Sequence, residues 1–356
     1  EVCLLAIFNV RESEEHLRQL ESSRVSVKYL YQTPINYLSL RRRIINFLSY
    51  LLIPLVAARV WFILSKGNYQ ILHVNLTLPS FSLLFIRFYR KLFSSEVKLL
   101  ATFHSNTHLI RGVSKWLNIA SWRACDHLVT EIFEKDISKV RSFSPNTPVS
   151  YIPFGYSSDN DRSHPNTIVK GNVLKICTVS RMRVFEKKID VMLDVVKALV
   201  DRGNDISFKL CGDGEDYSVI EAKIRSSNLE EHCEMVGFVD EAWEVYSESN
   251  LAFLATVEGE SGVSGMVALD AGCLLVGIES TSAENSQNKL NPNVGEIFYS
   301  SQIEKLADFC EKLIQEPDLF EMYKVQCIQR SGHNSSNASL FTARYRALYG
   351  KLLYES

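Results

Sequence analysis

The residues from Leu174 to Gly203 most constrain the fold of this chain, because they read as a strand, a basic loop and a helix in succession. Residues 174–179 form a short apolar run of the length typical of a buried strand. Apolar residues then recur at helical spacing over 189–200, and Gly203 ends the run. A strand–loop–helix unit of this kind is typical of an open α/β sheet, in which ligands bind outside the carboxyl ends of the strands.

The loop of this unit has the composition of an anion site. Four basic residues precede the helix: Arg181, Arg183, Lys187 and Lys188. A helix N-terminus adds N–H groups and the positive end of the helix dipole. Arginine grips phosphate in a bidentate manner, and lysine acts as a mobile point charge. We therefore interpret the loop as a diphosphate cradle; a solvated basic loop is the alternative.

Strands and helices alternate along both halves of the 356 residues, which predicts two doubly wound, Rossmann-like parallel-sheet domains. We expect an N-terminal domain over 1–155, a polar linker over 156–168 and a second domain over 169–335. A C-terminal helix over 336–356 is expected to pack back toward the first domain. The first glycine is Gly67, and a strand-like run begins at once, so we expect the first βα unit to be missing.

Composition excludes several classes of protein. The net charge of −2 argues against bulk nucleic-acid binding. The eight cysteines are scattered without a C-x-x-C pair, so we expect buried thiols in a reducing, cytoplasmic compartment. Residues 44–64 are apolar and long enough to cross a bilayer, but Pro54 and Arg59 are costly there. We expect a buried helix or one that lies at an interface.

Basic residues beside apolar ones form a further candidate surface. Three arginines precede the apolar segment, and three basic residues interleave with aromatic ones further along: Arg41, Arg42, Arg43, Arg87, Arg90 and Lys91. This composition is typical of a surface that binds anionic lipid. It predicts a peripheral protein on the cytoplasmic membrane face, with solvated residues beside core helices as the alternative.

Several short motifs together resemble those of family 4 glycosyltransferases with the GT-B fold. They are Arg181-x5-Lys187, the G-D-G turn at 212–214, and the stretches 69–74, 102–104, 151–155, 234–239 and 293–298. The resemblance implies two Rossmann-like domains facing a cleft. It also implies retaining transfer of a sugar, of hexosyltransferase type, from a nucleotide-diphosphate sugar to a hydroxyl of a glycan or lipid-linked acceptor. The implied pathway is cell-surface polysaccharide or lipopolysaccharide biosynthesis, with no metal or other cofactor.

The resemblance also assigns roles to single residues. It implies that Arg181 and Lys187 hold the diphosphate and that His104 contacts the transferred sugar. His104, Glu258 and Glu260 are the catalytic candidates. The remaining donor-binding candidates are Gly212, Asp213, Gly214, Gly237, Phe238, Gly262, Ser264, Gly265 and Asp270. Glycines also permit a plain strand-to-helix turn, which is the alternative for 212–214.

The acidic motif of the resembled family, E-x7-E, is altered in this chain. Glu258 fits its first half, but Met266 stands eight residues on. Alignment on Gly272 places Val267 at the second acid, whereas matching 267–271 to V-A-L-E-A places Asp270 there. We favour Asp270, because a carboxylate accepts hydrogen bonds from ribose hydroxyls. Two rival hypotheses stay open: a non-catalytic, nucleotide-binding GT-B protein and a sugar-nucleotide epimerase.

Overall fold

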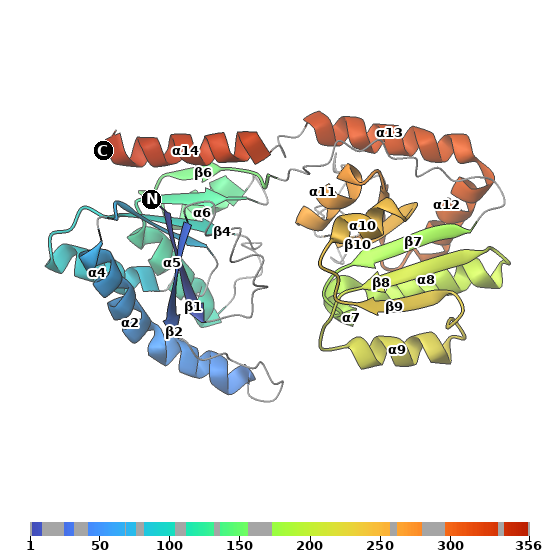
Figure 1. The fold of residues 1–356 in the computed structure, drawn as a ribbon, viewed down its shortest axis with the longest axis horizontal. Coiled ribbons are helices and arrows are strands. Elements are labelled where there is room, and N and C mark those ends of the chain that lie inside the picture. Colours follow the sequence, from blue (N-terminus) through green and yellow to red (C-terminus); the bar gives the residue numbers. More distant parts are fainter. Residues whose placement is uncertain are drawn as a thin grey trace. The chain divides into compact units, whose positions relative to one another are not determined.

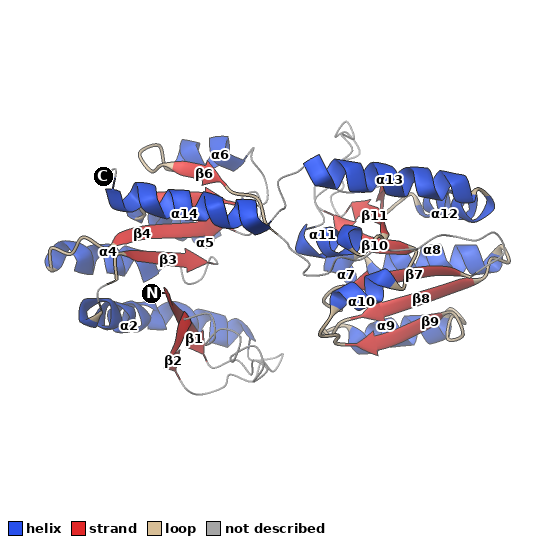
Figure 2. Ribbon diagram, turned by 45° about the horizontal axis from the view of Figure 1, so that its top comes forward, coloured by secondary structure: helices blue, strands red, loops and turns tan. Residues whose placement is uncertain are grey.

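The computed structural model describes residues 2–8, 25–31, 42–67, 69–75, 82–103, 112–131, 136–155, 173–256, 262–279, 296–333 and 338–354. The chain divides into two compact units (Figure 1). The first unit comprises Glu1–Pro153 and Arg344–Ser356, and the second comprises Phe154–Ala343. Figure 2 shows the strands of each unit with helices beside them.

The second unit is built on six parallel strands. They are β7 (Leu174–Val179), β8 (Ile206–Cys211), β9 (Cys233–Gly237), β10 (Leu251–Thr256), β11 (Leu274–Glu279) and β12 (Glu296–Tyr299). Their order across the sheet is β12-β11-β10-β7-β8-β9. This is the doubly wound order of dinucleotide-binding folds, and the chain reverses direction across the sheet between β7 and β10.

The helices of the second unit are α7 (Val184–Lys187), α8 (Ile189–Asp201), α9 (Tyr217–Ser226), α10 (Ala242–Ser247), α11 (Gly262–Asp270), α12 (Ile303–Gln315) and α13 (Pro317–His333). Helix α8 packs against α9 and α12, and α11 packs against α10 and α13. All six residues of β11 are buried, as expected for a parallel strand covered on both faces. Strand β7 has the predicted bounds, and the apolar stripe of α8 lies in the core.

The first unit contains a four-stranded parallel sheet in the order β3-β4-β5-β6 and a separate parallel pair. The strands are β1 (Val2–Phe8), β2 (Val25–Tyr31), β3 (Ile71–Asn75), β4 (Lys98–Phe103), β5 (His127–Thr130) and β6 (Val149–Tyr151). The helices are α2 (Arg42–Lys66), α4 (Ser82–Leu92), α5 (Gly112–Ala124), α6 (Asp136–Phe143) and, from Arg344 on, α14 (Ala338–Tyr354). The predicted fold class, two parallel-sheet α/β domains, is confirmed.

The last helix, α14, is bound to the sheet of the first unit through two tyrosines. The Tyr345 hydroxyl donates to Glu131 Oε1 (2.6 Å) and lies 3.1 Å from Thr102 Oγ1. His73 bonds to the Tyr349 hydroxyl through Nδ1 (2.8 Å) and to Thr102 Oγ1 through Nε2 (2.6 Å). These partners lie at or near the carboxyl ends of β3, β4 and β5, so α14 completes the polar core of this unit.

Helix α2 covers most of the apolar segment that raised the question of a membrane span. Its buried side chains include Ala57, Trp61 and Leu64, which belong to the core of the first unit. Within the described part of the chain, no helix combines the length and apolar content that crossing a membrane requires.

Candidate functional site

The chain reverses across the second sheet between β7 and β10, which makes this the switch point of the sheet. The loop after β7 leads to α7 and α8, and the chain after β10 leads to α11. In open α/β sheets, the carboxyl ends of the strands at such a switch point are where ligands bind. Residues 257–261, which include Glu258 and Glu260, and residue His104 lie outside the described residues.

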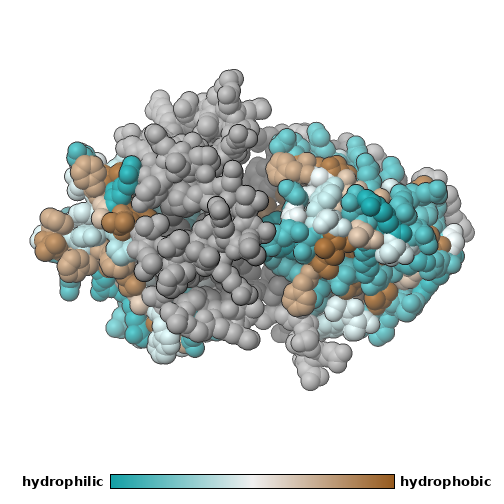
Figure 3. All heavy atoms as spheres, turned by 90° about the horizontal axis from the view of Figure 1, so that it is seen from below, coloured by the Kyte–Doolittle hydropathy of each residue, from teal (hydrophilic) through white to brown (hydrophobic). Residues whose placement is uncertain are grey.

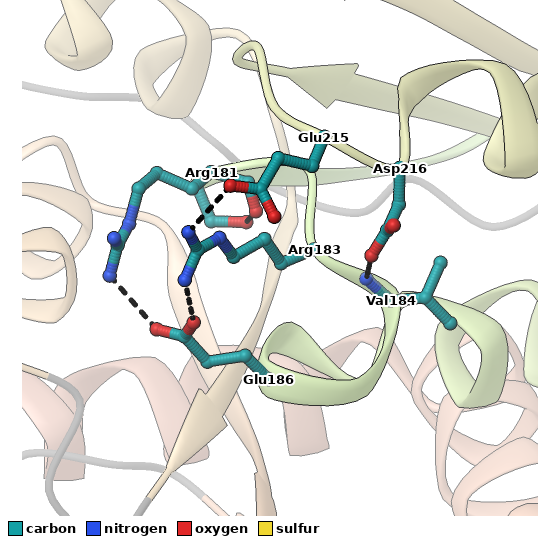
Figure 4. Close-up of polar contacts among 7 residues, drawn as sticks. Arg181, Arg183, Val184, Glu186, Glu215 and Asp216 are labelled. Atoms are coloured by element: carbon teal, nitrogen blue, oxygen red, sulfur yellow. Dashed lines mark hydrogen bonds and ion pairs between the residues drawn. The ribbon is translucent and has the colours of Figure 1, made fainter. Parts of the chain in front are cut away.

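The basic loop after β7 is ordered by ion pairs (Figure 4). Arg181 and Arg183 both bond to Glu186, each at 2.9 Å, and Arg183 bonds also to Glu215 at 3.1 Å. Arg183 has a side chain only 25% exposed and is held by two carboxylates, whereas Arg181 is 63% exposed and bonds to one. Arg181 therefore retains exposed N–H groups that an incoming anion can use.

Positive charge is in excess in this loop, and Lys187 reflects it. Residues 181–188 carry four basic side chains and one carboxylate, that of Glu186. Burial lowers the pKa of Lys187, and the charges of Arg181 and Arg183 lower it further, against the opposing effect of Glu186. Burial alone would raise the pKa of Glu186, but its hydrogen bond to Arg183 and the neighbouring cations hold that pKa below its usual value. A phosphate oxygen near Lys187 would favour its charged form.

The start of the following helix differs from the expected anion-binding helix terminus. Only four residues form α7, and the N–H of Val184 donates to Asp216 Oδ2 (2.9 Å). Lys188 then adopts a left-handed conformation (φ 52°), which separates α7 from α8. The carboxylate of Asp216 already bonds to the first helical N–H, so the loop side chains, rather than this terminus, carry the attraction for an anion.

The backbone of the G-D-G turn after β8 packs against the backbone of the basic loop. A Cβ at Gly212 (φ +135°) would lie 1.9 Å from the Ser180 carbonyl oxygen, and one at Gly214 would lie 2.4 Å from that of Met182. The N–H of Met182 donates to the Asp213 carbonyl (3.0 Å), and Asp213 Oδ1 accepts from Gly214 N (2.7 Å). Both glycines are therefore required by close backbone approach, which favours the structural alternative for the turn.

Gly237 and Phe238 lie next to the same turn. The Gly237 carbonyl accepts a hydrogen bond from the N–H of Gly212 (2.6 Å), and Gly237 has a positive φ of 81°. The ring of Phe238 is 75% exposed. The structure thus brings the 212–214 turn, Gly237 and Phe238 together with the basic loop.

Ser264 fixes the start of α11 beside the end of β7. Its hydroxyl bonds to the Val179 carbonyl (3.0 Å) and lies 3.1 Å from the hydroxyl of buried Tyr246. Gly262, the first residue of α11, has a positive φ of 67° and is exposed, whereas Gly265 is buried. Gly262, Ser264 and Gly265 therefore lie on the part of α11 that begins beside the end of β7, and the Ser264 hydroxyl bonds within the protein.

Asp270 lies at the other end of α11, and the structure does not bring it together with the basic loop. Asp270 lies eight positions after Gly262, and this corresponds to about 12 Å along a helix axis. Its carboxylate accepts a hydrogen bond from Trp243 Nε1 (3.1 Å). Val267, the other aligned position, packs partly buried against the core. Neither alignment puts a carboxylate on the first turn of α11.

Two polar residues at this edge of the sheet were missed in the sequence analysis. Thr256 and Glu279 end β10 and β11 and pair directly in the sheet register. Both are buried, Glu279 with only 4% of its surface exposed. The sequence did contain a signal for Glu279, since it is an acidic residue that ends an otherwise apolar strand and buried carboxylates are uncommon.

Cysteines and metal ligands add no further centre to the parts of the chain placed in the structure. Six cysteines, Cys125, Cys177, Cys211, Cys233, Cys273 and Cys310, are buried free thiols. Among the residues whose side chains are described, no group of three His, Cys, Asp or Glu side chains is arranged to hold a metal ion.

The two parallel-sheet units have a GT-B architecture, the fold of a large class of glycosyltransferases. The family model described as "Glycosyl transferases group 1" matches residues 159–329, which cover most of the second unit. No curated protein matches this chain significantly.

Solved structures share the fold at low sequence identity. Sucrose-phosphate synthase from Thermosynechococcus elongatus is 14% identical with a TM-score of 0.69, covering 100% of this chain and 99% of its own. HepE from Anabaena, in complex with UDP, is 12% identical with a TM-score of 0.70, covering 98% and 100%. A mutant of TarM from S. aureus, in complex with fondaparinux, alpha-GlcNAc-glycerol and UDP, is 14% identical with a TM-score of 0.60. That match covers 82% of this chain, which spans only 58% of TarM.

Proposed function

We propose that this protein is a glycosyltransferase that moves a sugar from a nucleotide-diphosphate sugar to a hydroxyl acceptor. The observation that carries the proposal is the excess of positive charge in the loop after β7, at the switch point of a Rossmann-like sheet. The match of residues 159–329 to the group 1 glycosyltransferases supports the same assignment.

Transfer of the sugar requires the protein to stabilise the departing diphosphate. Preorganised positive charge at the place where negative charge develops is usually the largest single contribution to catalysis. Arg181 supplies exposed N–H donors to the diphosphate, and Lys187, whose pKa is lowered by burial and by Arg181 and Arg183, supplies a charge that a phosphate would favour. Arg183, held by Glu186 and Glu215, keeps the loop in place.

The finer points of the proposal come from the resemblance to family 4. They are retention at the anomeric carbon, a hexosyl donor, contact of His104 with the sugar, participation of Glu258 and Glu260, and no requirement for a metal or cofactor. The acceptor is a glycan or lipid-linked precursor of a cell-surface polysaccharide or lipopolysaccharide, used in the cytoplasm. Because HepE and the TarM mutant were solved with UDP, uridine diphosphate is the first nucleotide to test.

Thermal melting with a nucleotide panel tests the donor site. A nucleotide at about 100 times its dissociation constant should stabilise the protein by about 2.7 kcal/mol. Arg181→Ala should abolish the shift in melting temperature. Arg225→Ala is the matched control, because Arg225 is also 63% exposed and also bonds to one carboxylate, Glu221 at 2.8 Å. Loss of the shift in both variants, or in neither, would contradict the assigned cradle.

Turnover assays separate the proposed activity from its rivals. A glycosyltransferase should release nucleoside diphosphate from the stabilising donor sugar only when a hydroxyl acceptor is present. Product from donor and water alone would indicate the epimerase hypothesis. Binding of the donor with no turnover on any glycan or lipid-linked acceptor would indicate the non-catalytic one.

A further inference from the structure

Helices α2 and α4 of the first unit expose an unusual amount of apolar surface. On α4, Phe85, Phe88 and Leu92 recur at helical spacing on the outer face, with exposed fractions of 37%, 61% and 62%. They lie opposite the buried side chains of Leu83 and Ile86, so this helix is apolar on two faces. In Figure 3, hydrophobic side chains gather at the left of the view, where Figure 1 places α4.

Helix α2, which packs against α4, exposes apolar side chains of its own. The two helices pack against each other, and the Trp61 ring stacks on Phe93 at 5.8 Å between centroids. Phe93 itself is 61% exposed at the end of α4, and Leu55 and Phe62 of α2 are 61% and 56% exposed. We call these six residues, Leu55, Phe62, Phe85, Phe88, Leu92 and Phe93, the α2–α4 surface. Soluble proteins seldom leave so many large apolar side chains together without a partner.

The charges within helices α2 and α4 are of one sign, although the exposed Glu96 follows shortly after α4. Helices α2 and α4 together contain seven basic residues and no aspartate or glutamate. Lys91 is exposed beside Leu92, and Lys66 Nζ lies 4.3 Å above the Phe62 ring. Arg90, by contrast, bonds to Asp126 and to the Val97 carbonyl, and Arg87 bonds to the Arg123 carbonyl. Lys66 and Lys91 are therefore the cations best placed to meet an external anion.

We propose that the α2–α4 surface binds the face of an anionic lipid bilayer. Aromatic and aliphatic side chains insert at the boundary between headgroups and acyl chains, and lysines pair with anionic headgroups. An anionic bilayer complements helices that carry basic residues and no acidic ones, and it buries exposed apolar side chains at the same time. The inference goes beyond the proposed activity, because it involves only residues of the first unit.

Flotation of the full chain with lipid vesicles tests the proposal. We expect binding to vesicles containing phosphatidylglycerol, and about fivefold weaker binding when Lys91 is changed to Gln, from the usual contribution of one surface lysine. Phe88→Ser with Leu92→Ser should weaken binding by about tenfold or more, since both apolar anchors are removed. Met322→Ser with Val325→Ser is the matched control, because both residues are exposed (45% and 47%) on α13 of the second unit.

Three outcomes would overturn the proposal. They are no binding to anionic vesicles, equal binding to purely zwitterionic vesicles, and equal loss of binding in both double variants. Light scattering covers one other occupant: a dimer that dissociates in the Phe88/Leu92 variant would assign the α2–α4 surface to a second copy of the chain. Nucleotide-induced stabilisation, measured without vesicles, is independent of all these results, so failure here leaves the donor site untouched.

Discussion

The substitution Gly214→Ala, which adds one methyl group, tests whether the G-D-G turn positions the basic loop. In Gly214→Ala the new Cβ would lie 2.4 Å from the Met182 carbonyl oxygen and 2.7 Å from its carbonyl carbon and amide nitrogen. These are backbone atoms, so the loop itself has to move. Gly214 has no positive φ, and the whole cost therefore arises from the steric overlap. Overpacking of this kind typically costs about 1–3 kcal/mol.

Thermal unfolding measures this cost. For a domain of this size a loss of about 2 kcal/mol lowers the melting temperature by roughly 4–8 °C. Two other glycines separate the possible causes. Gly350→Ala in α14 places its Cβ within 4 Å of nothing and should be neutral or stabilise by up to about 1 kcal/mol. Gly203→Ala also meets nothing within 4 Å but has a φ of +83°, so it reports backbone strain alone.

The response to nucleotide decides the interpretation. We expect Gly214→Ala to reduce nucleotide-induced stabilisation, because Arg181 and Lys187 lie on the displaced loop. Gly203→Ala should lose stability but keep the full response, since Gly203 lies beyond α8. A Gly214→Ala protein with wild-type melting temperature and wild-type response to nucleotide would refute the argument that close backbone approach requires glycine there.

Three further predictions concern the cores of the two units. Burial, together with the charge of Lys351, lowers the pKa of His127 to about 4. Stability on the order of 3 kcal/mol should therefore be fully present above about pH 6.5 and be lost as the pH falls toward 4, and urea midpoints of His127→Asn should lack this dependence. Tyr345→Phe should cost about 1–3 kcal/mol in urea unfolding, more than Tyr349→Phe, because it removes a hydroxyl that donates to the buried Glu131 carboxylate. Burial raises the pKa of Cys211 to about 11 and that of Cys233 to about 12, so thiol reagents should label them at pH 8 only after unfolding; peptide mapping that finds either labelled in the folded protein would contradict their burial.

Local sequence patterns predicted those elements whose cause is local. The bounds of β7 and the buried stripe of α8 follow from apolar periodicity, which depends only on neighbours in the chain. The break between α7 and α8 was not predictable, because a left-handed conformation at Lys188 has no signal in the residue type. His73 shows the same limit at long range: it lies within β3, in the stretch 69–74 that the motifs singled out, but it bonds to Tyr349, 276 residues away in the sequence.

The location of the candidate site could be predicted from the sequence, but most of its contacts could not. The basic loop after β7 was found from its charges, and the structure gathers the 212–214 turn and the start of α11 around it. The physical reason for the two glycines, close approach to Ser180 and Met182, arises only from the packing of two loops. The position of Asp270 was decided by where α11 ends, which the altered acidic motif did not determine.

The bonding of α14 to the first unit has a consequence for the order of events during synthesis. Residues 344–354 complete the first unit, but they leave the ribosome after every residue of Phe154–Ala343. The second unit is a continuous segment and is available to fold as soon as it has emerged. Before Tyr345 has been synthesised, the hydrogen bonds that its hydroxyl makes with Thr102 and Glu131 cannot form, and the buried polar network of the first unit is incomplete. In this chain the unit whose synthesis begins first is thus completed last, and a released chain that ends before residue 344 would contain the whole second unit but lack the residues that complete the first.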